Sequence, residues 1–142
     1  MKQKRLQIQI ASYLLLTKNN KILMMRRFNT GWSDGMYTLP SGHIDKGEMP
    51  LETICREAKE EVDVIVNPLN TNLIHIHFEK DNYVDFYFQT DSWNGTPVIN
   101  EPDKCDKLNW LKFKELDNYE IPKKIKVAIL SIREGNYYSQ SD

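Results

Sequence analysis

Apolar residues in the first part of the chain fall into short runs that favour β-strands. The ranges 6–17 and 21–28 are rich in Leu, Ile and Met, and the turn-forming sequence Lys-Asn-Asn at 18–20 separates them. These ranges predict two strands joined by a hairpin turn. Residues 29–35 are predicted to form a loop, because Asn, Ser, Asp and Gly dominate that range. A short strand is predicted at 36–39, and the proline that follows should end it.

A helical spacing replaces the strand pattern after position 50. Five apolar residues recur every three or four positions and form one stripe: Leu51, Ile54, Cys55, Ala58 and Val62. Pro50 suits the first helical position, and Glu52 is placed to bond back to the start of the helix. Met49 precedes that start and offers no capping side chain. The spacing therefore predicts a helix that begins at Pro50 and has one apolar face.

The rest of the chain alternates strand-like and loop-like segments and closes with a second helical pattern. Strands are predicted at 64–66, 73–78, 83–90 and 108–113. A turn at 93–95, a polar loop at 98–107 and a helix over 121–133 begun by Pro122 are also predicted. Strands before, between and after two helices predict an α/β fold, an α/β/α sandwich with a mixed β-sheet between helices. No repeat or linker interrupts the sequence, so a single domain over 1–142 is expected.

Composition and charge exclude one class of partner. The chain has 19 Lys and Arg against 20 Asp and Glu, for a formal net charge of −1. A protein that binds nucleic acid by neutralising many phosphates needs a large basic excess, so nucleic acid is not an expected partner. Two cysteines are too few for a disulfide framework, which makes a reducing, cytoplasmic setting the expected one. No apolar run is long enough to suggest a membrane span.

The first predicted helix has a second face that carries three carboxylates. Glu57, Glu60 and Glu61 stand at i, i+3 and i+4, so their side chains should gather on one side of the helix. Such a cluster is repulsive on its own, whereas carboxylate oxygens suit Mg²⁺ or Mn²⁺, with substrate phosphates as further ligands. By spacing alone, a solvated helix face with i, i+4 ion pairs such as Arg56–Glu60 explains the same pattern.

The residues around this helix resemble a known motif. Gly42 is followed after five residues by Glu48, and after seven more by Arg56-Glu57-Ala58-Lys59-Glu60-Glu61-Val62-Asp63-Val64. This run closely resembles the Nudix box, G-x5-E-x7-R-E-U-x-E-E-x-G-U with U aliphatic, of the MutT/Nudix hydrolases. The approach to the box, Leu39-Pro40-Ser41-Gly42, resembles the family's Leu-Pro-Gly-Gly. One box position differs, because Asp63 replaces a glycine that would form a left-handed helix end, which should cost stability more than activity.

The resemblance implies a metal-dependent hydrolase that cleaves a nucleoside diphosphate linked to another group, on an α/β/α fold. The implied metal is Mg²⁺, with Mn²⁺ as a substitute, and its implied ligands are Glu57, Glu60, Glu61 and the backbone carbonyl of Ser41. Arg56 and Glu48 resemble the family's supporting pair, in which the arginine orients the first helix glutamate. A carboxylate left free of the metal would accept the proton of the attacking water, and Glu60 and Glu61 are candidates for that role.

A second segment narrows the resemblance. Glu101-Pro102-Asp103-Lys104-Cys105, followed by Trp110, resembles a signature of Nudix enzymes that hydrolyse nucleoside triphosphates. In that group the glutamate of this loop lies near the metals, which makes Glu101 a candidate ligand or general base. A polar loop tied down by Pro102 explains the same residues without a catalytic role.

Candidates for substrate contact lie before the helix. Arg27 ends the second predicted strand, where family members often place a basic residue near the substrate phosphates, and His43 lies beside the start of the box. Four aromatic residues could stack a base: Trp32, Tyr37, Phe86 and Phe88. The last two alternate along a predicted strand, which favours the core for both. Arg27, His43 and Tyr37 are therefore the candidate substrate-binding residues.

Together these residues favour a Mg²⁺-dependent hydrolase of a nucleoside triphosphate, normal or modified, that releases a nucleoside monophosphate and pyrophosphate. Two alternatives stay open: hydrolysis of ADP-ribose or a nucleotide sugar, and a Nudix-fold domain that binds a ligand without catalysis. The expected partner is a small nucleotide, with no nucleic acid and no membrane. A homodimer agrees with the habit of the family, although no sequence feature specifies an interface.

Overall fold

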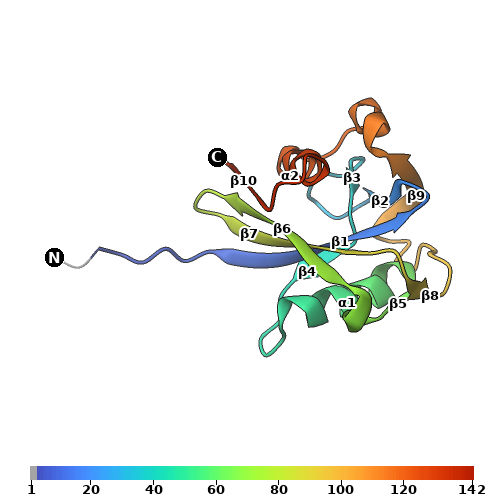
Figure 1. Cartoon of the computed structure of the whole chain (residues 1–142), viewed down its shortest axis with the longest axis horizontal. Coiled ribbons are helices and arrows are strands. Elements are labelled where there is room, and N and C mark those ends of the chain that lie inside the picture. The colour runs from blue at the N-terminus through green and yellow to red at the C-terminus, as the bar shows by residue number, and fades with distance from the viewer. Residues whose placement is uncertain (1–2) are drawn as a thin grey trace.

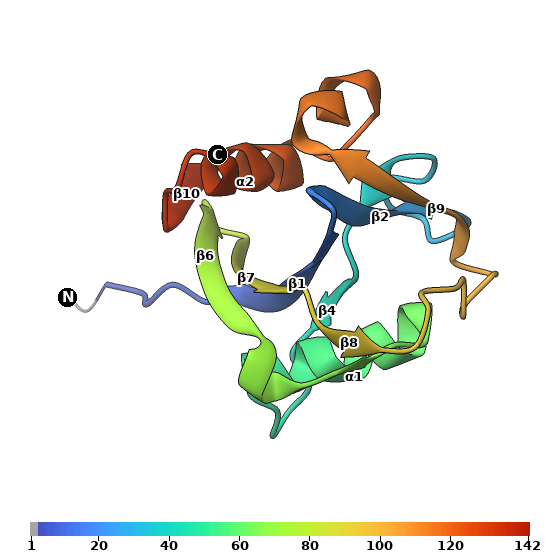
Figure 2. The same ribbon diagram turned by 45° about the vertical axis from the view of Figure 1, so that its right-hand side comes forward.

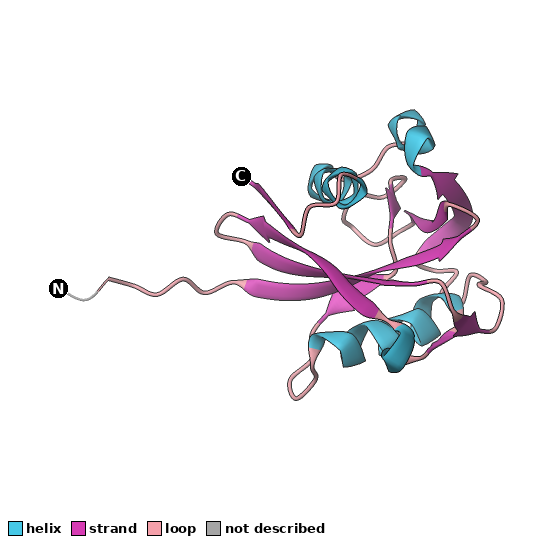
Figure 3. Cartoon of the chain, viewed as in Figure 1, coloured by secondary structure: helices cyan, strands magenta, loops and turns pink. Residues whose placement is uncertain are grey.

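A computed structural model describes residues 3–142, and Figure 1 and Figure 3 show its helices and strands. The elements in chain order are β1 (Gln9–Lys18), β2 (Lys21–Arg27), β3 (Tyr37–Thr38), β4 (Ser41–His43), α1 (Pro50–Val62), β5 (Ile65–Val66), the 3-10 helix η1 (Pro68–Asn70), β6 (Asn72–Glu79), β7 (Tyr83–Thr90), β8 (Trp93–Asn94), β9 (Cys105–Lys112), the 3-10 helix η2 (Phe113–Asn118), α2 (Lys123–Arg133) and β10 (Tyr138–Ser141).

The large sheet is mixed and lies between the two α-helices. Its strand order is β10-β6-β7-β1-β2-β3, with β4 paired to β1 and β9 paired to β2. The pairs β1–β7 and β6–β10 are parallel, and the other pairs are antiparallel. Figure 1 and Figure 2 show α1 on one side of this sheet and α2 on the other, which confirms the predicted α/β/α sandwich. Within residues 3–142, neither helix has the length and apolarity to cross a membrane.

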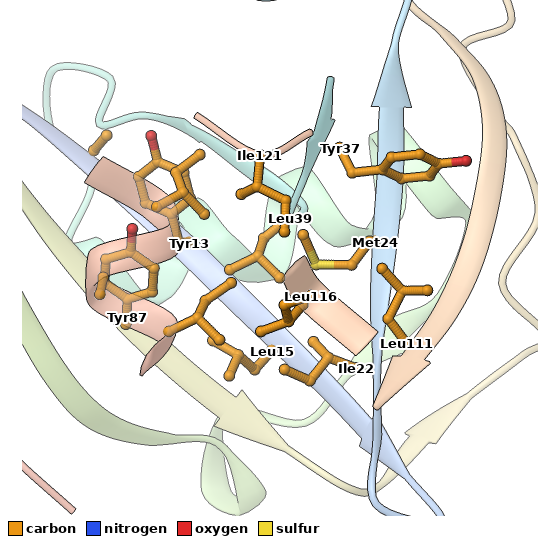
Figure 4. Packing of buried hydrophobic residues seen from close by; sticks show 14 residues of the cluster. Tyr13, Leu15, Ile22, Met24, Tyr37, Leu39, Tyr87, Leu111, Leu116 and Ile121 are labelled. Atoms are coloured by element: carbon orange, nitrogen blue, oxygen red, sulfur yellow. The ribbon is translucent and has the colours of Figure 1, made fainter. Parts of the chain in front are cut away.

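Strand β1 is buried on both faces, because it runs through the middle of the sheet. Tyr13 and Leu15 belong to the core on the α2 side, part of which is shown in Figure 4. Leu14 and Leu16 alternate with them and belong to the second core, which includes Ile54 of α1. Side chains alternate between the faces of a strand, so one uniformly apolar run supplies both cores.

The ends of α1 match the local chemistry of the sequence. The Met49 amide donates to Glu52 Oε1 at 3.1 Å, which satisfies one free N–H at the helix start. At the other end Asp63 has φ 57° and ψ 43°, the left-handed conformation that glycine adopts most easily. The Asp63 amide donates back to the carbonyl of Lys59. Asp63 therefore caps the helix in the geometry expected of the glycine that it replaces.

An Asp63→Gly substitution is expected to stabilise the protein by about 1 kcal/mol, because glycine adopts the left-handed conformation without the Cβ penalty. The lost carboxylate pairs only with the exposed Lys59, and surface ion pairs contribute little. The midpoint of thermal unfolding should rise by about 4 °C. Asp63→Ala is the matched control, since it removes the carboxylate but keeps Cβ; equal stabilisation by both variants would contradict the backbone argument.

The structure differs from the sequence prediction where pairing between segments distant in the sequence determines where an element begins or ends. Residues 6–8 lie outside the first strand, because the Gln9 amide, bonded to the carbonyl of Asn82, marks where β1 begins to pair. The expected turn at 93–95 contains β8, which pairs with β5. The expected loop at 98–107 ends early, because β9 begins at Cys105 beside β2. Helix α2 begins at Lys123, two residues later than predicted.

Strand β10 was not predicted, because Tyr-Ser-Gln-Ser carries no apolar alternation. It is held to β6 by side chains as well as by backbone pairing. The Ser139 hydroxyl lies 2.7 Å from His75 Nε2 and 2.6 Å from His77 Nδ1, and the Ser141 hydroxyl lies 2.8 Å from His77 Nε2. Burial lowers the pKa of His77 to about 4, so this imidazole is neutral at pH 7. The two histidines therefore hold β10 at the edge of the sheet.

Candidate active site

A cavity of about 990 Å³ collects most of the residues that the sequence singles out. Its wall includes Ser41 and Gly42 of β4, Glu57 and Glu61 of α1, and Glu101 of the loop before β9. Three segments far apart in the sequence thus meet at one surface. The pairing of β4 with β1 and the packing of α1 against β1 bring the first two together.

Glu57 and Glu61 face each other across one turn of α1. Their carboxyl groups are hydrogen-bonded to one another, and the Ser41 amide donates to Glu61 Oε1 at 3.1 Å. Burial raises the pKa of Glu61 well above its ordinary value, and the adjacent Glu57 raises it further. Burial also raises the pKa of Glu57. Two such carboxyl groups share a proton when alone and offer a divalent cation adjacent oxygen ligands.

Arg56 fixes the first of these glutamates from the side. Its Nε and Nη2 bind the two carboxylate oxygens of Glu48 at 2.7 and 3.0 Å, and its Nη1 donates to Glu57 Oε1 at 2.8 Å. The fork of Arg56 lowers the pKa of Glu48 to about 2, so Glu48 stays ionised. The Asp45 amide and the Thr53 hydroxyl also donate to Glu48. Glu48 therefore fixes the position of the guanidinium that donates to Glu57.

Glu60 shares the guanidinium of Arg56 with Glu57. Its carboxylate accepts from Arg56 Nη1 at 3.2 Å, its side chain is half exposed, and it does not line the cavity. Because the same Arg56 nitrogen binds both glutamates, Glu60 lies close enough to Glu57 to raise the pKa of Glu57, although of the three carboxylates only Glu57 and Glu61 line the cavity. Within residues 3–142, no three His, Cys, Asp or Glu side chains gather closely enough to hold a metal by themselves. Glu60 would have to leave Arg56 to bind a metal beside Glu61.

Glu101 is brought to the cavity by a clamp on the end of α1. Asn100 Nδ2 donates to the carbonyl of Glu60 at 3.0 Å, and the Asn100 amide donates to the carbonyl of Glu61 at 3.1 Å. These carbonyls belong to the last turn of the helix, where they have no partner within it. Asn100 thus places the next residue close enough for its charge to raise the pKa of Glu61. Sequence analysis missed this role, although an asparagine beside a candidate catalytic residue is a signal for such a cap.

Only two of the three predicted substrate-binding residues lie in the cavity wall. Arg27 and His43 line the cavity, and His43 Nε2 lies 2.6 Å from the Tyr83 hydroxyl. Tyr37 is buried, lies edge-on to Tyr119 and belongs to the core, as Figure 4 shows. It does not line the cavity and is not carried into the proposed site.

A model of the NUDIX domain matches residues 7–129, most of the chain and all of the box. The chain belongs to the Nudix hydrolase family. The 8-oxo-dGTP diphosphatase of Escherichia coli (strain K12) is 29% identical to this Nudix hydrolase over 93 residues, which cover 63% of this chain and 70% of the relative.

Two solved structures share the fold. A MutT NUDIX hydrolase from Burkholderia pseudomallei matches with a TM-score of 0.73 and 19% identity, over 92% of this chain and 99% of that one. A bifunctional NMN adenylyltransferase/ADP ribose pyrophosphatase from Francisella tularensis, complexed with AMP and a Mn ion, matches with a TM-score of 0.67 and 17% identity. That match covers 92% of this chain and 42% of the other. At these identities the likeness establishes the fold of the Nudix hydrolase, and the substrate has to be argued from its own site.

A charged cluster missed by sequence analysis forms another part of the Nudix cavity wall. Lys124 Nζ lies 3.2 Å from Asp85 Oδ2, 3.7 Å from Glu79 Oε1 and 3.9 Å from the centre of the Tyr83 ring. Asp85 is fully buried, and burial raises its pKa to about 6. The signal in the sequence is Asp85 itself, which stands on the strand face opposite to the apolar face of Phe86 and Phe88.

Gly42→Ala is expected to lower turnover by this Nudix hydrolase about 100-fold, because a Cβ at that position would lie 2.4 Å from both Cδ and Oε1 of Glu57. The Glu57 carboxylate must move aside, which separates it from Glu61. The measurement is kcat/KM together with Mn²⁺ affinity. Gly135→Ala is the control: its φ is 83° and nothing lies within 4 Å, so it should cost stability alone. Unchanged Mn²⁺ affinity in Gly42→Ala would contradict the steric argument.

Proposed function

We propose that this Nudix hydrolase is a Mg²⁺-dependent pyrophosphohydrolase of nucleoside triphosphates, normal or modified, which releases a nucleoside monophosphate and pyrophosphate. The observation that carries the proposal is the facing pair of half-buried carboxyl groups on Glu57 and Glu61 in the wall of the cavity. A volume of about 990 Å³ is in the range of sites that enclose small ligands. Its wall also carries Lys123, whose charge suits an anionic substrate.

The residues present fit a divalent cation. Glu57, Glu61 and the backbone carbonyl of Ser41 would hold it, and oxygens of the substrate would complete the ligand set, since Mg²⁺ sites in proteins commonly use few side chains. When bound, the cation neutralises phosphate charge and makes water more acidic. The geometry of Glu57 depends in turn on Arg56 and Glu48, which hold its carboxylate before substrate arrives.

Glu101 is the proposed general base. Glu60 is occupied by Arg56 and Glu61 by Glu57 and Ser41, whereas the nearest cation to Glu101 is Lys104 Nζ at 3.8 Å. Its carboxylate therefore has capacity left to accept a proton from water in the cavity. The remaining contribution of the protein is positioning, because phosphoanhydride hydrolysis depends on orientation and charge stabilisation more than on covalent catalysis. His43 would donate to a phosphate oxygen from its place beside Gly42.

A triphosphate substrate is favoured over other nucleoside diphosphate derivatives by two features. The Glu101-Pro102-Asp103-Lys104-Cys105 segment resembles that of triphosphate-hydrolysing Nudix enzymes, and its glutamate reaches the cavity. The similar Escherichia coli protein is an 8-oxo-dGTP diphosphatase. The first of these features lies outside the box.

The test is a panel of nucleoside triphosphates, 8-oxo-dGTP, ADP-ribose and nucleotide sugars, incubated with the protein and Mg²⁺, with products identified by chromatography. A nucleoside monophosphate and pyrophosphate in equal amounts is the expected result, and excess EDTA should stop the reaction. Preferential cleavage of ADP-ribose to AMP and ribose 5-phosphate would replace the proposal with the nucleotide-sugar alternative. Absence of turnover on every compound would favour a binding domain instead.

A further inference from the structure

Trp32 is an exposed aromatic side chain in the wall of the cavity. Its exposed fraction is 47%, although an indole ring is large and apolar. The other three aromatic candidates for base stacking do not line the cavity: Tyr37, Phe86 and Phe88. Tyr13 and Tyr83 do line it, but Tyr13 is buried, and Tyr83 is less exposed than Trp32 and has its hydroxyl bonded to His43. Trp32 is therefore the aromatic group with free surface facing a ligand.

The loop that carries Trp32 is built to hold it in place. Asp34 accepts hydrogen bonds from the Thr30 amide, the Thr30 hydroxyl and the Gly31 amide, at 2.9, 2.6 and 3.0 Å. Ser33 has φ 50°, a left-handed conformation that a serine adopts at a cost. The hydrogen bonds of Asp34 therefore hold the loop around Trp32 in a defined conformation.

Arg27 supports the indole from β2. Its Nε donates to the carbonyl of Trp32 at 2.6 Å, its Nη2 donates to the Thr30 hydroxyl at 2.8 Å, and its guanidinium carbon lies 4.8 Å from the centre of the Trp32 ring. A guanidinium over an indole is a favourable cation–π contact. Because these donors are already used, Arg27 fixes the ring rather than binding substrate phosphates through them.

Besides Arg26 and Arg27, the segments on either side of the loop at 29–35 contribute apolar or neutral side chains to the wall. Met25 and Thr38 are register partners on β2 and β3, and both line the cavity, as does Met36. By contrast, the wall formed by Tyr83 and Lys124 carries Glu79 and Lys123. A neutral, flat base fits the first environment better than the second.

We infer that Trp32 is the stacking platform for the base of the substrate nucleotide, which places the nucleoside beside the loop at 29–35 and the phosphates at Glu57 and Glu61. The inference rests on the proposed function for the identity of the ligand. The strength of stacking depends on the area of a base and not on its hydrogen-bonding edge, so Trp32 favours purines over pyrimidines.

The test measures binding rather than turnover, with probes that resist hydrolysis. Calorimetric titrations with Mg²⁺ present compare α,β-methylene-ATP, α,β-methylene-CTP and tripolyphosphate, which has no base. In Trp32→Ala, affinity for the ATP analogue should fall about 5- to 150-fold, and affinity for tripolyphosphate should stay within about twofold. The preference for the ATP analogue over the CTP analogue should shrink in the same variant. Trp32→Phe should keep most of the affinity, because it retains an aromatic face.

Phe28→Ala is the matched control. Phe28 is exposed to 46%, nearly the same fraction as Trp32, and lies four residues away without lining the cavity. This variant should bind all three probes as the wild type does. Equal binding of the ATP analogue by wild type and Trp32→Ala would overturn the inference, as would an equal loss for tripolyphosphate. Base-dependent binding without hydrolysis in the panel would instead overturn the proposed function and leave the platform standing.

Discussion

Glu61→Gln is expected to lower Mg²⁺-dependent turnover about 1,000-fold or more while the protein keeps its fold. The amide has nearly the shape of the carboxylate and still accepts a hydrogen bond from the Ser41 amide. It carries no charge, so the pair with Glu57 loses one of its two anionic groups and holds a divalent cation much more weakly. Losses of this size are typical when a group that stabilises charge in the transition state is removed.

The measurement is kcat/KM over a range of Mg²⁺ concentrations, with thermal unfolding of the metal-free protein as the test of folding. Glu52→Gln is the control on the same helix, because Glu52 bonds only to the Met49 amide at the helix start and is exposed. Its turnover should stay within about twofold of wild type. Full activity in Glu61→Gln would disprove the assignment of Glu61 to the metal site.

Lys124→Met is expected to destabilise the protein by about 3–5 kcal/mol, because it leaves a buried carboxylate without its counter-charge. Asp85 is fully buried, and within residues 3–142 neither of its carboxylate oxygens accepts a hydrogen bond. The Lys124 ammonium at 3.2 Å is therefore the compensating group. Methionine keeps most of the volume of lysine, so the loss of stability measures the missing charge rather than a change in packing.

Urea unfolding at pH 7 measures the effect, and the double variant Lys124→Met/Asp85→Asn is the control. The double variant should recover most of the loss, because no ionised group remains buried there. The penalty should also shrink as the pH falls through about 6, the pKa of Asp85 in the folded protein, because a protonated carboxyl group no longer needs the ammonium as its counter-charge. A penalty independent of pH, or no recovery in the double variant, would point to packing instead.

Local patterns were sufficient for the elements that form locally. The stripe from Leu51 to Val62 predicted α1 with its correct start, because helical contacts join residues three and four apart. The spacing of Glu57 and Glu61 likewise predicted that their carboxyl groups would meet. Glu60 also lies near Glu57, because one nitrogen of Arg56 binds both carboxylates, but it does not line the cavity.

What the sequence could not provide depends on partners distant along the chain. Strand β8 exists because β5 lies beside it, and β10 because His75 and His77 offer their ring nitrogens to its serines. The clamp of Asn100 on the end of α1 joins residues 40 positions apart. Such contacts are set by the tertiary fold, so neither propensity nor periodicity in one sequence contains them.

The covering of β6 by β10 has a consequence for biosynthesis. Ser139 binds His77, a residue made 62 positions earlier, so the outer edge of β6 leaves the ribosome long before the strand that pairs with it. An unpaired strand edge is a template for pairing with other chains. The nascent protein therefore passes through a stage at which it depends on dilution or on chaperones to stay unpaired. That stage ends when four mostly polar residues add to the sheet.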